Sequence, residues 1–280
     1  MSYYRYTPRT LLRELVMVLI GLAWMVPIFL LLNVSIKPGG FEVYGSPFAV
    51  TSKPTLSNYS TAWQGSAVGS LGHGFVNSAI ITSISVALLI AIGSLTAYTI
   101  ARRGGRASRL LTGLFTFGLA LPVQLGTIPL FAEMRKLGLV GTYSGMVIIY
   151  VGLLMPLTIF LYMGFLRSLP LDYEQAARVD GASPLRIFFR VVFPLLRPAT
   201  GTVAILCGLI IWNDFFTPLI FLGGNSHATL PVVIYGFVAG LGTEWNIIFA
   251  AVAISVAPLV IFFIFAQRQL IRGYSGGIKA

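Results

Sequence analysis

The chain has 280 residues, of which 56% are hydrophobic and 10% are charged, and its mean hydropathy is +0.87. Soluble domains carry about 25% charged residues, so this composition excludes a soluble globular protein and indicates an integral membrane protein. The net charge of +11 suggests nucleic-acid binding only until the charges are located along the chain. The single cysteine, Cys207, excludes a disulfide framework, and His73 and His227 are not spaced as metal ligands.

Six apolar segments are long enough to cross a bilayer, which takes roughly 20 residues. No cleavage site follows the first, so we expect an uncleaved span rather than a signal peptide. The third contains Pro122 and Pro129, which are tolerated where neighbouring helices satisfy the freed carbonyls. The sequence predicts one all-α transmembrane domain over residues 1–280, with spans at approximately 12–34, 75–101, 110–131, 143–166, 202–222 and 247–267.

The basic residues fall almost entirely on one side of this predicted topology. With both termini inside, fifteen of the nineteen lysines and arginines lie in cytoplasmic segments. This asymmetry fits the positive-inside rule and accounts for the net charge without nucleic acid. The four exceptions are Lys37, Lys53, Arg135 and Lys136.

The longest polar interruption between spans is the segment 167–198, which begins with a predicted short helix. Asp172 is placed to cap this helix, with Gln175 three residues on as its capping-box partner. Gly181 suits the left-handed position that closes it. The charges of this segment exclude it from lipid.

A second short helix is predicted after the glycine. Ser183 is placed as its N-cap, and Pro184 occupies the first helical position, where a missing N–H costs nothing. Pro194 and Pro198 are expected to end the helix before the next span. A helix, a glycine turn and a helix between two spans form a surface that another protein could grip.

Residues 175–181, QAARVDG, and 191–194, VVFP, resemble the EAA loop of ABC importer permeases, with departures at Gln175, Val191 and Phe193. The resemblance implies a type I importer permease whose cytoplasmic coupling helices dock on a separate ATPase. Because Gln175 has no charge, it cannot make any ion pair of the kind that the glutamate of the pattern makes. The docking residues it implies are Glu174, Gln175, Ala176, Ala177, Asp180, Gly181, Ser183, Val191, Phe193 and Pro194.

Three further segments resemble the carbohydrate branch of this family, with the smaller permease of maltose-type importers as the nearest type. They are WNDFF at 212–216 with TLP at 229–231, KLGLVGTYSG at 136–145, and the ending at 267–280. The family implies a second permease, an ATPase homodimer, an extracytoplasmic solute-binding protein and an inner-membrane location. The cytoplasmic tail 268–280 is then expected to contact the ATPase through Ser275, Gly276, Gly277 and Lys279.

Asp214 is the one carboxylate deep inside a predicted span, since Glu14 lies at the edge of the first, and an ionisable group at depth is a candidate functional site. With Trp212 and Asn213 it could line a sugar pathway, because carboxylates and amides pair with hydroxyls and aromatic rings stack on sugars. The alternative is that Asp214 holds helices together through a neighbouring hydroxyl or amide.

No catalytic motif is present: the chain has no GxxxxGK[ST], HExxH or GxSxG pattern. The sequence therefore predicts a non-enzyme without its own cofactor, with Mg-ATP bound by the partner ATPase. The rival is a gradient-driven carrier or channel acting alone, which usually shows inverted repeats and several intramembrane charges. A membrane enzyme is a weaker alternative, since no acidic or histidine cluster marks either face.

Overall fold

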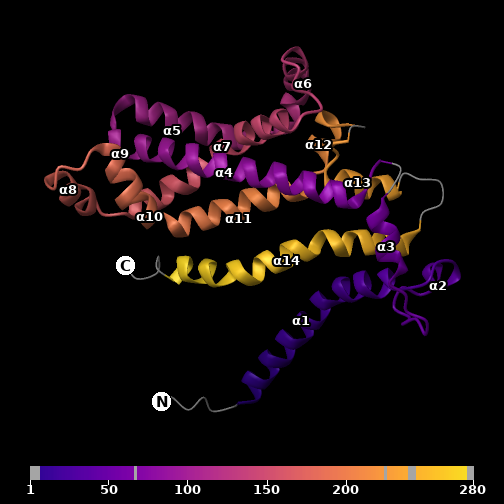
Figure 1. Ribbon diagram of the computed structural model, residues 1–280. Coiled ribbons are helices and arrows are strands. Elements are labelled where there is room, and N and C mark those ends of the chain that lie inside the picture. The colour runs from indigo at the N-terminus through magenta and orange to yellow at the C-terminus, as the bar shows by residue number, and fades with distance from the viewer. Residues whose placement is uncertain (1–6, 66–67, 224–225, 239–243, 276–280) are drawn as a thin grey trace. The chain divides into compact units, whose positions relative to one another are not determined.

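The computed structural model describes residues 7–65, 68–223, 226–238 and 244–275, and the regular elements within these ranges are all helices (Figure 1). This confirms the predicted all-α class. The chain divides into two compact units. The first comprises residues 1–71 and 234–257, and the second comprises residues 72–233 and 258–280.

The first unit begins with a long apolar helix, α1 (Pro8–Ser35). Thr7 and Thr10 form a capping box at its start, each side chain accepting from the backbone N–H of the other. Its apolar side chains are exposed along nearly the whole length, from Leu11 to Leu32. A helix that is apolar on every side is suited to a membrane rather than to water.

The loop that follows α1 is ordered by polar side chains that bind backbone carbonyls. It carries two short helices, α2 (Phe41–Tyr44) and α3 (Ser57–Gln64). Asn33 Nδ2 donates to the carbonyl of Pro47 at 2.8 Å, and Lys37, which is buried, donates from Nζ to the carbonyl of Ser46 at 2.8 Å. Asn58 donates to the carbonyl of Lys37 at 2.8 Å. These bonds replace the regular pairing that the loop lacks.

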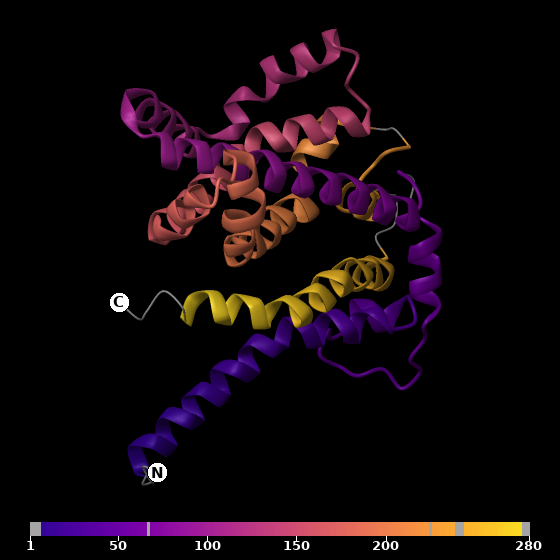
Figure 2. The ribbon, with the colours of Figure 1, turned by 60° about the vertical axis from the view of Figure 1, so that its left-hand side comes forward.

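The second unit is built on four long helices that run side by side in both views (Figures 1 and 2). They are α4 (Leu71–Arg103), α5 (Gly105–Ala120), α7 (Tyr143–Ser168) and α11 (Arg197–Asn213). Leu89, Tyr162 and Val203 are fully buried at the centre of their core. Gly93 of α4 lies against Thr158 of α7, so these two helices approach closely.

Gly93→Ala is expected to lower the unfolding temperature of the purified protein. An added Cβ would collide with Cγ2 of Thr158, whose rotamer is fixed by a 2.9 Å bond from its hydroxyl to the carbonyl of Leu154. Overpacking of this kind costs about 1–3 kcal/mol. Gly152→Ala on α7 is the matched control, because nothing lies within 4 Å of its added Cβ. Equal unfolding temperatures for the two variants would contradict the close packing of α4 and α7.

The predicted third span, 110–131, is interrupted. The helix α5 ends at Ala120, and Leu121 is extended with a ψ of 125° because Pro122 follows it. A 3-10 turn, η1 (Val123–Gly126), and a separate helix, α6 (Thr127–Lys136), complete the segment. The sequence predicts one span here with Pro122 and Pro129 inside it, and Pro122 accounts for the interruption.

The predicted fifth span, 202–222, is also interrupted. The helix α11 ends before Asp214, which is extended with a ψ of 123°, and a short helix, α12 (Phe216–Phe221), follows. Oδ1 of Asp214 accepts from the backbone N–H groups of Phe216 and Thr217 at 3.0 and 3.3 Å. An aspartate that binds the backbone in this way begins a new helix instead of continuing the old one.

Two more helices complete the fold, α13 (Leu230–Val238) and α14 (Trp245–Ser275). In the described chain, α1, α4 and α7 are long and apolar enough to cross a membrane alone. A fourth candidate is the helical run 184–195 together with α11, which meet at a bend of 72°. Because the third and fifth segments are broken, the six-span topology stays a prediction.

Candidate functional site

The polar segment 167–198 folds as a helix, a glycine turn and a second helical run. The first helix is α8 (Asp172–Val179). Gly181 follows with a φ of 77°, in the left-handed region that the sequence predicted. The Gly181 N–H donates to the carbonyl of Arg178 and the Ala182 N–H to that of Ala177, both at 3.0 Å. This pair of bonds is a Schellman motif, which closes the helix firmly.

The second run is α9 (Pro184–Ile187), a π-helical turn η2 (Phe188–Val192) and α10 (Phe193–Leu195). Ser183 is its N-cap and Pro184 its first residue, as predicted, although the Ser183 side chain makes no capping bond. Pro194 does not end the helix as expected. It lies inside the run, and the axis turns only at Leu196, before Pro198 in the first turn of α11.

The start of α8 corrects another expectation. Asp172 is the first residue of the helix and not its cap, and the cap position is held by Leu171, which has no capping side chain. Asp172 therefore acts in the first turn, where a carboxylate interacts favourably with the positive end of the helix dipole. The expected capping box with Gln175 is absent, and the Gln175 side chain is exposed.

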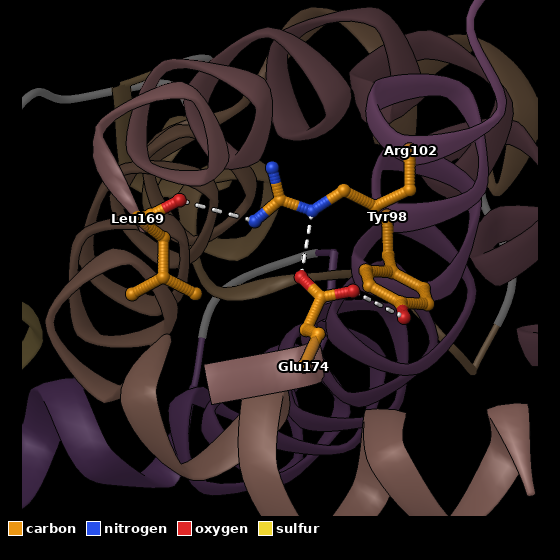
Figure 3. Close-up of polar contacts among 4 residues, drawn as sticks. All are labelled: Tyr98, Arg102, Leu169 and Glu174. Carbon is orange, nitrogen blue, oxygen red and sulfur yellow. Dashed lines mark hydrogen bonds and ion pairs between the residues drawn. The ribbon is translucent and has the colours of Figure 1, made fainter. Parts of the chain in front are cut away.

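Glu174 anchors α8 to the end of α4 (Figure 3). Its side chain is 1% exposed, and Oε1 accepts from Nε of Arg102 at 2.7 Å while Oε2 accepts from the Tyr98 hydroxyl at 2.9 Å. Arg102 also donates from Nη2 to the carbonyl of Leu169 at 3.2 Å. Removing one partner of a buried pair leaves an uncompensated charge, so this cluster fixes the position of α8.

Apolar packing completes the attachment of the loop. Phe188 of η2 is buried, and its ring centroid lies 5.2 Å from that of Tyr98. Ile187, Val192 and Leu196 are also buried in the core of the second unit. Both halves of the loop are therefore packed against α4, α8 through the ion pair of Glu174 with Arg102 and η2 through the contact of Phe188 with Tyr98.

The structure divides the predicted docking residues into three groups. Glu174 is turned inward, which corrects the expectation that it faces a partner protein. The exposed members are Gln175, Ala176, Asp180, Gly181 and Ser183. The half-buried members are Ala177, Val191, Phe193 and Pro194.

The four most exposed of the large apolar side chains of this polar loop are what we call the outer apolar set. They are Tyr173, Val179, Leu185 and Phe189, with exposures of 53%, 88%, 61% and 60%. Contacts between proteins concentrate on exposed apolar groups of this kind. Sequence reasoning did not name them, and no regular alternation with buried residues marks them, since both neighbours of Val179 and of Leu185 are exposed.

Sequence reasoning also missed Tyr98 and Arg102. They stand four residues apart, hence on one face of α4, which is the spacing at which two side chains share a ligand. Their partner Glu174 is 72 residues from Arg102 along the chain, so no local pattern could have joined them.

The predicted tail contacts lie almost wholly outside the described residues. Ser275 is the last residue of α14, and Gly276, Gly277 and Lys279 fall beyond the description. Among the described residues no group of three His, Cys, Asp or Glu side chains is arranged to hold a metal.

The three predicted pathway residues point to different places. Trp212 packs edge-on against Phe75, with ring centroids 5.5 Å apart. Asn213 is exposed and donates to the carbonyl of Leu209 at 2.8 Å. Asp214 alone accepts a bond from Tyr150, at 3.0 Å. Trp212 and Asp214 therefore contact different side chains, Phe75 and Tyr150 respectively.

The motifs at 136–145 and 229–231 belong to one polar cluster at the end of the second unit opposite α8 (Figure 1). The Gly141 N–H donates to the carbonyl of Phe221 at 2.8 Å, and the Gly141 carbonyl lies 2.9 Å from Nδ1 of His227. The Tyr143 hydroxyl donates to Oδ1 of Asn77 at 2.6 Å. Segments that are distant in sequence are thus joined around one glycine turn.

A bundle of apolar helices that carries a polar loop packed against one of them has the architecture of a membrane transport subunit. Comparison with known proteins supplies the family. Residues 89–276 match the family described as the binding-protein-dependent transport system inner membrane component, and the chain belongs to it.

The curated relatives of this chain cover nearly its full length. It is 36% identical over 260 residues to the melibiose/raffinose/stachyose import permease protein MelC of Bacillus subtilis (strain 168), with 92% of each chain covered. It is 32% identical to the diacetylchitobiose uptake system permease protein NgcG of Streptomyces coelicolor, with 90% of this chain and 83% of the relative covered. The fold resembles that of a bacterial ABC transporter involved in the import of the acidic polysaccharide alginate, with a TM-score of 0.82, 22% identity, and 96% of this chain and 99% of that chain covered.

Proposed function

We propose that this chain is one permease subunit of an ATP-driven carbohydrate importer. It forms half of a transmembrane passage, and a separate ATPase works it through the loop 169–198. The observation that carries the proposal is the attachment of that loop: Glu174 and Phe188 fasten it to α4, while the outer apolar set remains free for a partner. A surface held this rigidly transmits displacement instead of absorbing it.

The proposed topology has six spans with both termini in the cytoplasm. The distribution of basic residues supports it, because fifteen of nineteen then lie inside. The broken third and fifth segments, α5–α6 and α11–α12, are each counted as one span. Non-helical backbone at membrane depth is tolerated where protein groups satisfy its hydrogen bonds. Here Oδ1 of Asp214 accepts from the backbone N–H groups of Phe216 and Thr217.

The proposed partners are a second permease, an ATPase homodimer and an extracytoplasmic solute-binding protein. The ATPase binds Mg-ATP and meets the outer apolar set and the tail that includes Gly276, Gly277 and Lys279. The binding protein meets the outer loops, 33–74 and 223–246. Residues Asn33, Lys37 and Asn58 give the first of these loops a fixed shape on which a partner can dock.

The proposed solute class is a sugar or oligosaccharide. It is supported by the names of relatives that cover most of the chain, which include import permeases for melibiose, raffinose and stachyose and for diacetylchitobiose. Asp214 is the one carboxylate deep inside a predicted span, so the chain does not have the array of charges from which ion-coupled carriers work.

The proposal is tested by uptake into proteoliposomes that contain the full complex with its binding protein. Labelled raffinose, maltotriose and diacetylchitobiose are supplied, with and without ATP inside, and ionophores collapse all ion gradients. We expect at least one sugar to accumulate only with ATP and to do so without gradients. Uptake that needs a gradient and ignores ATP would establish the rival, a secondary carrier.

A further inference from the structure

A cavity with a mostly apolar lining lies beside the break between α11 and α12. Its volume is about 210 Å³, and its walls come from α6, α7, α11 and α12. Four polar side chains line it, Thr127, Tyr150, Asp214 and Thr217, and the remaining wall is aliphatic and aromatic. A few convergent polar groups in an apolar wall are the usual form of a small-molecule site.

The polar groups of this cavity keep unused hydrogen-bonding capacity. Oδ1 of Asp214 accepts from two backbone N–H groups, whereas Oδ2 accepts, within the described part of the chain, only from the Tyr150 hydroxyl, at 3.0 Å. A carboxylate oxygen accepts two bonds, and a tyrosine hydroxyl that donates one can still accept another. The hydroxyls of Thr127 and Thr217 have no hydrogen-bond partner among the described residues and line the cavity.

We infer that this cavity is a contact site for one ring of a neutral carbohydrate on its way through the complex, an inference that rests on the proposed function. Sugar hydroxyls both donate and accept, so they match a free acceptor on Asp214 and the hydroxyls of Tyr150, Thr127 and Thr217. The apolar wall suits the C–H faces of the ring. The volume is smaller than the roughly 300–1,000 Å³ of sites for larger ligands, which fits a single ring rather than a chain of sugars.

The composition of the site argues against a cation as its ligand. Asp214 is its only carboxylate, and no group of three potential metal ligands exists within the described residues. The site also differs from the pathway predicted from sequence, because Trp212 and Asn213 are not among its lining residues. Tyr150, Thr127 and Thr217 take their place.

The inference is tested by cysteine protection. The chain has one cysteine, Cys207, which is buried, so Cys207→Ala provides a background without thiols. Thr127→Cys in this background is exposed to a charged, membrane-impermeant thiosulfonate in proteoliposomes that hold the full complex, its binding protein and ATP. Lys136→Cys is the control, because the Lys136 side chain is 70% exposed at the end of α6, outside the predicted spans, and does not line the cavity.

We expect Thr127→Cys to react, and the sugar that is taken up from the panel of raffinose, maltotriose and diacetylchitobiose to slow the reaction about threefold or more. The sugar leaves the reaction rate of Lys136→Cys unchanged. Failure of Thr127→Cys to react, or reaction at a rate that the transported sugar does not alter, overturns the inference. ATP-driven uptake measured in the same vesicles separates this failure from failure of the proposed function, which would abolish uptake of every sugar.

A second experiment separates sugar contact from a merely structural bond. Tyr150→Phe removes the hydroxyl that faces the cavity, and Tyr162→Phe removes a hydroxyl on the same helix that donates to Thr200 at 3.0 Å outside the cavity. Loss of one hydrogen bond corresponds to roughly a three- to tenfold change in an equilibrium constant. We expect the KM for uptake to rise by that factor in Tyr150→Phe alone. Equal KM values in the two variants would show that the Tyr150 hydroxyl serves only the fold.

Discussion

Replacing Gly181 with aspartate is expected to reduce ATP-driven uptake about tenfold or more, because a non-glycine residue at a φ of 77° costs on the order of 1–3 kcal/mol in the turn that holds α8 against α9. The turn relaxes, and Tyr173 and Val179 before it then shift relative to Leu185 and Phe189 after it. The membrane helices remain folded, since nothing lies within 4 Å of the added Cβ. Uptake, co-purification of the ATPase and the unfolding temperature are measured together.

Gly138→Asp is the matched control for this experiment. Gly138 has a φ of 68°, nothing within 4 Å of its added Cβ, and a position in the loop after α6, away from α8. It experiences the same backbone strain and gains the same charge. We expect it to retain most of the uptake. Normal transport by Gly181→Asp, or equal losses in the two variants, would show that the glycine turn has no special part in coupling.

Glu174→Gln is expected to uncouple ATP hydrolysis from transport and to destabilise the protein by about 3 kcal/mol, the lower end for breaking a buried ion pair. The substitution leaves the Arg102 guanidinium, with its side chain only 14% exposed, facing a neutral amide. The helix α8 then loses its charged attachment to α4. We expect the ATPase activity of the complex to persist while sugar uptake falls. Thermal unfolding and the ratio of sugar transported to ATP hydrolysed are the measurements.

Glu133→Gln is the control for the ion pair. Glu133 meets Lys136 at the same distance of 2.7 Å, but the side chains are 62% and 70% exposed, so the pair is worth about 0–1 kcal/mol. It should change neither stability nor coupling measurably. The double variant Arg102→Met with Glu174→Leu should recover stability, because apolar groups of similar volume replace a buried pair well. A Glu174→Gln protein as stable as the Glu133→Gln protein would contradict the role of Glu174 as an anchor.

Local sequence was sufficient to predict the shape of the loop at its glycine. Gly181, Ser183 and Pro184 act through their own backbone preferences, so neighbouring residues determine the outcome. The role of Glu174 was not predictable in the same way. It depends on Arg102, whose Nε the fold brings within 2.7 Å of Oε1 of Glu174. The carboxylate that was expected to face a partner therefore forms an ion pair within the chain.

The breaks in the third and fifth segments illustrate a different limit. Hydropathy averages over a window, so it predicts an apolar segment without revealing whether the helix within it is continuous. Pro122 and Asp214 each interrupt a helix by a local mechanism, the first by forcing Leu121 to be extended and the second by binding the N–H groups of α12. Whether such a residue bends a helix, breaks it or leaves it straight also depends on its neighbours in space. Tyr150, which donates to Asp214, is such a neighbour, and only the structure reveals it.

The π turn η2 contains one residue more than an α-helical turn, and the Phe193 N–H accordingly bonds to the carbonyl of Phe188, five residues back. Deleting Arg190, whose side chain is exposed, would let the run rewind as a plain α-helix. Everything before the deletion would then rotate by about 100° around the axis relative to α10, since each residue contributes that angle. Glu174 and the outer apolar set would then point in a different direction relative to α10, although no remaining side chain had changed. The length of η2, as much as its composition, therefore determines the direction in which α8 and α9 face.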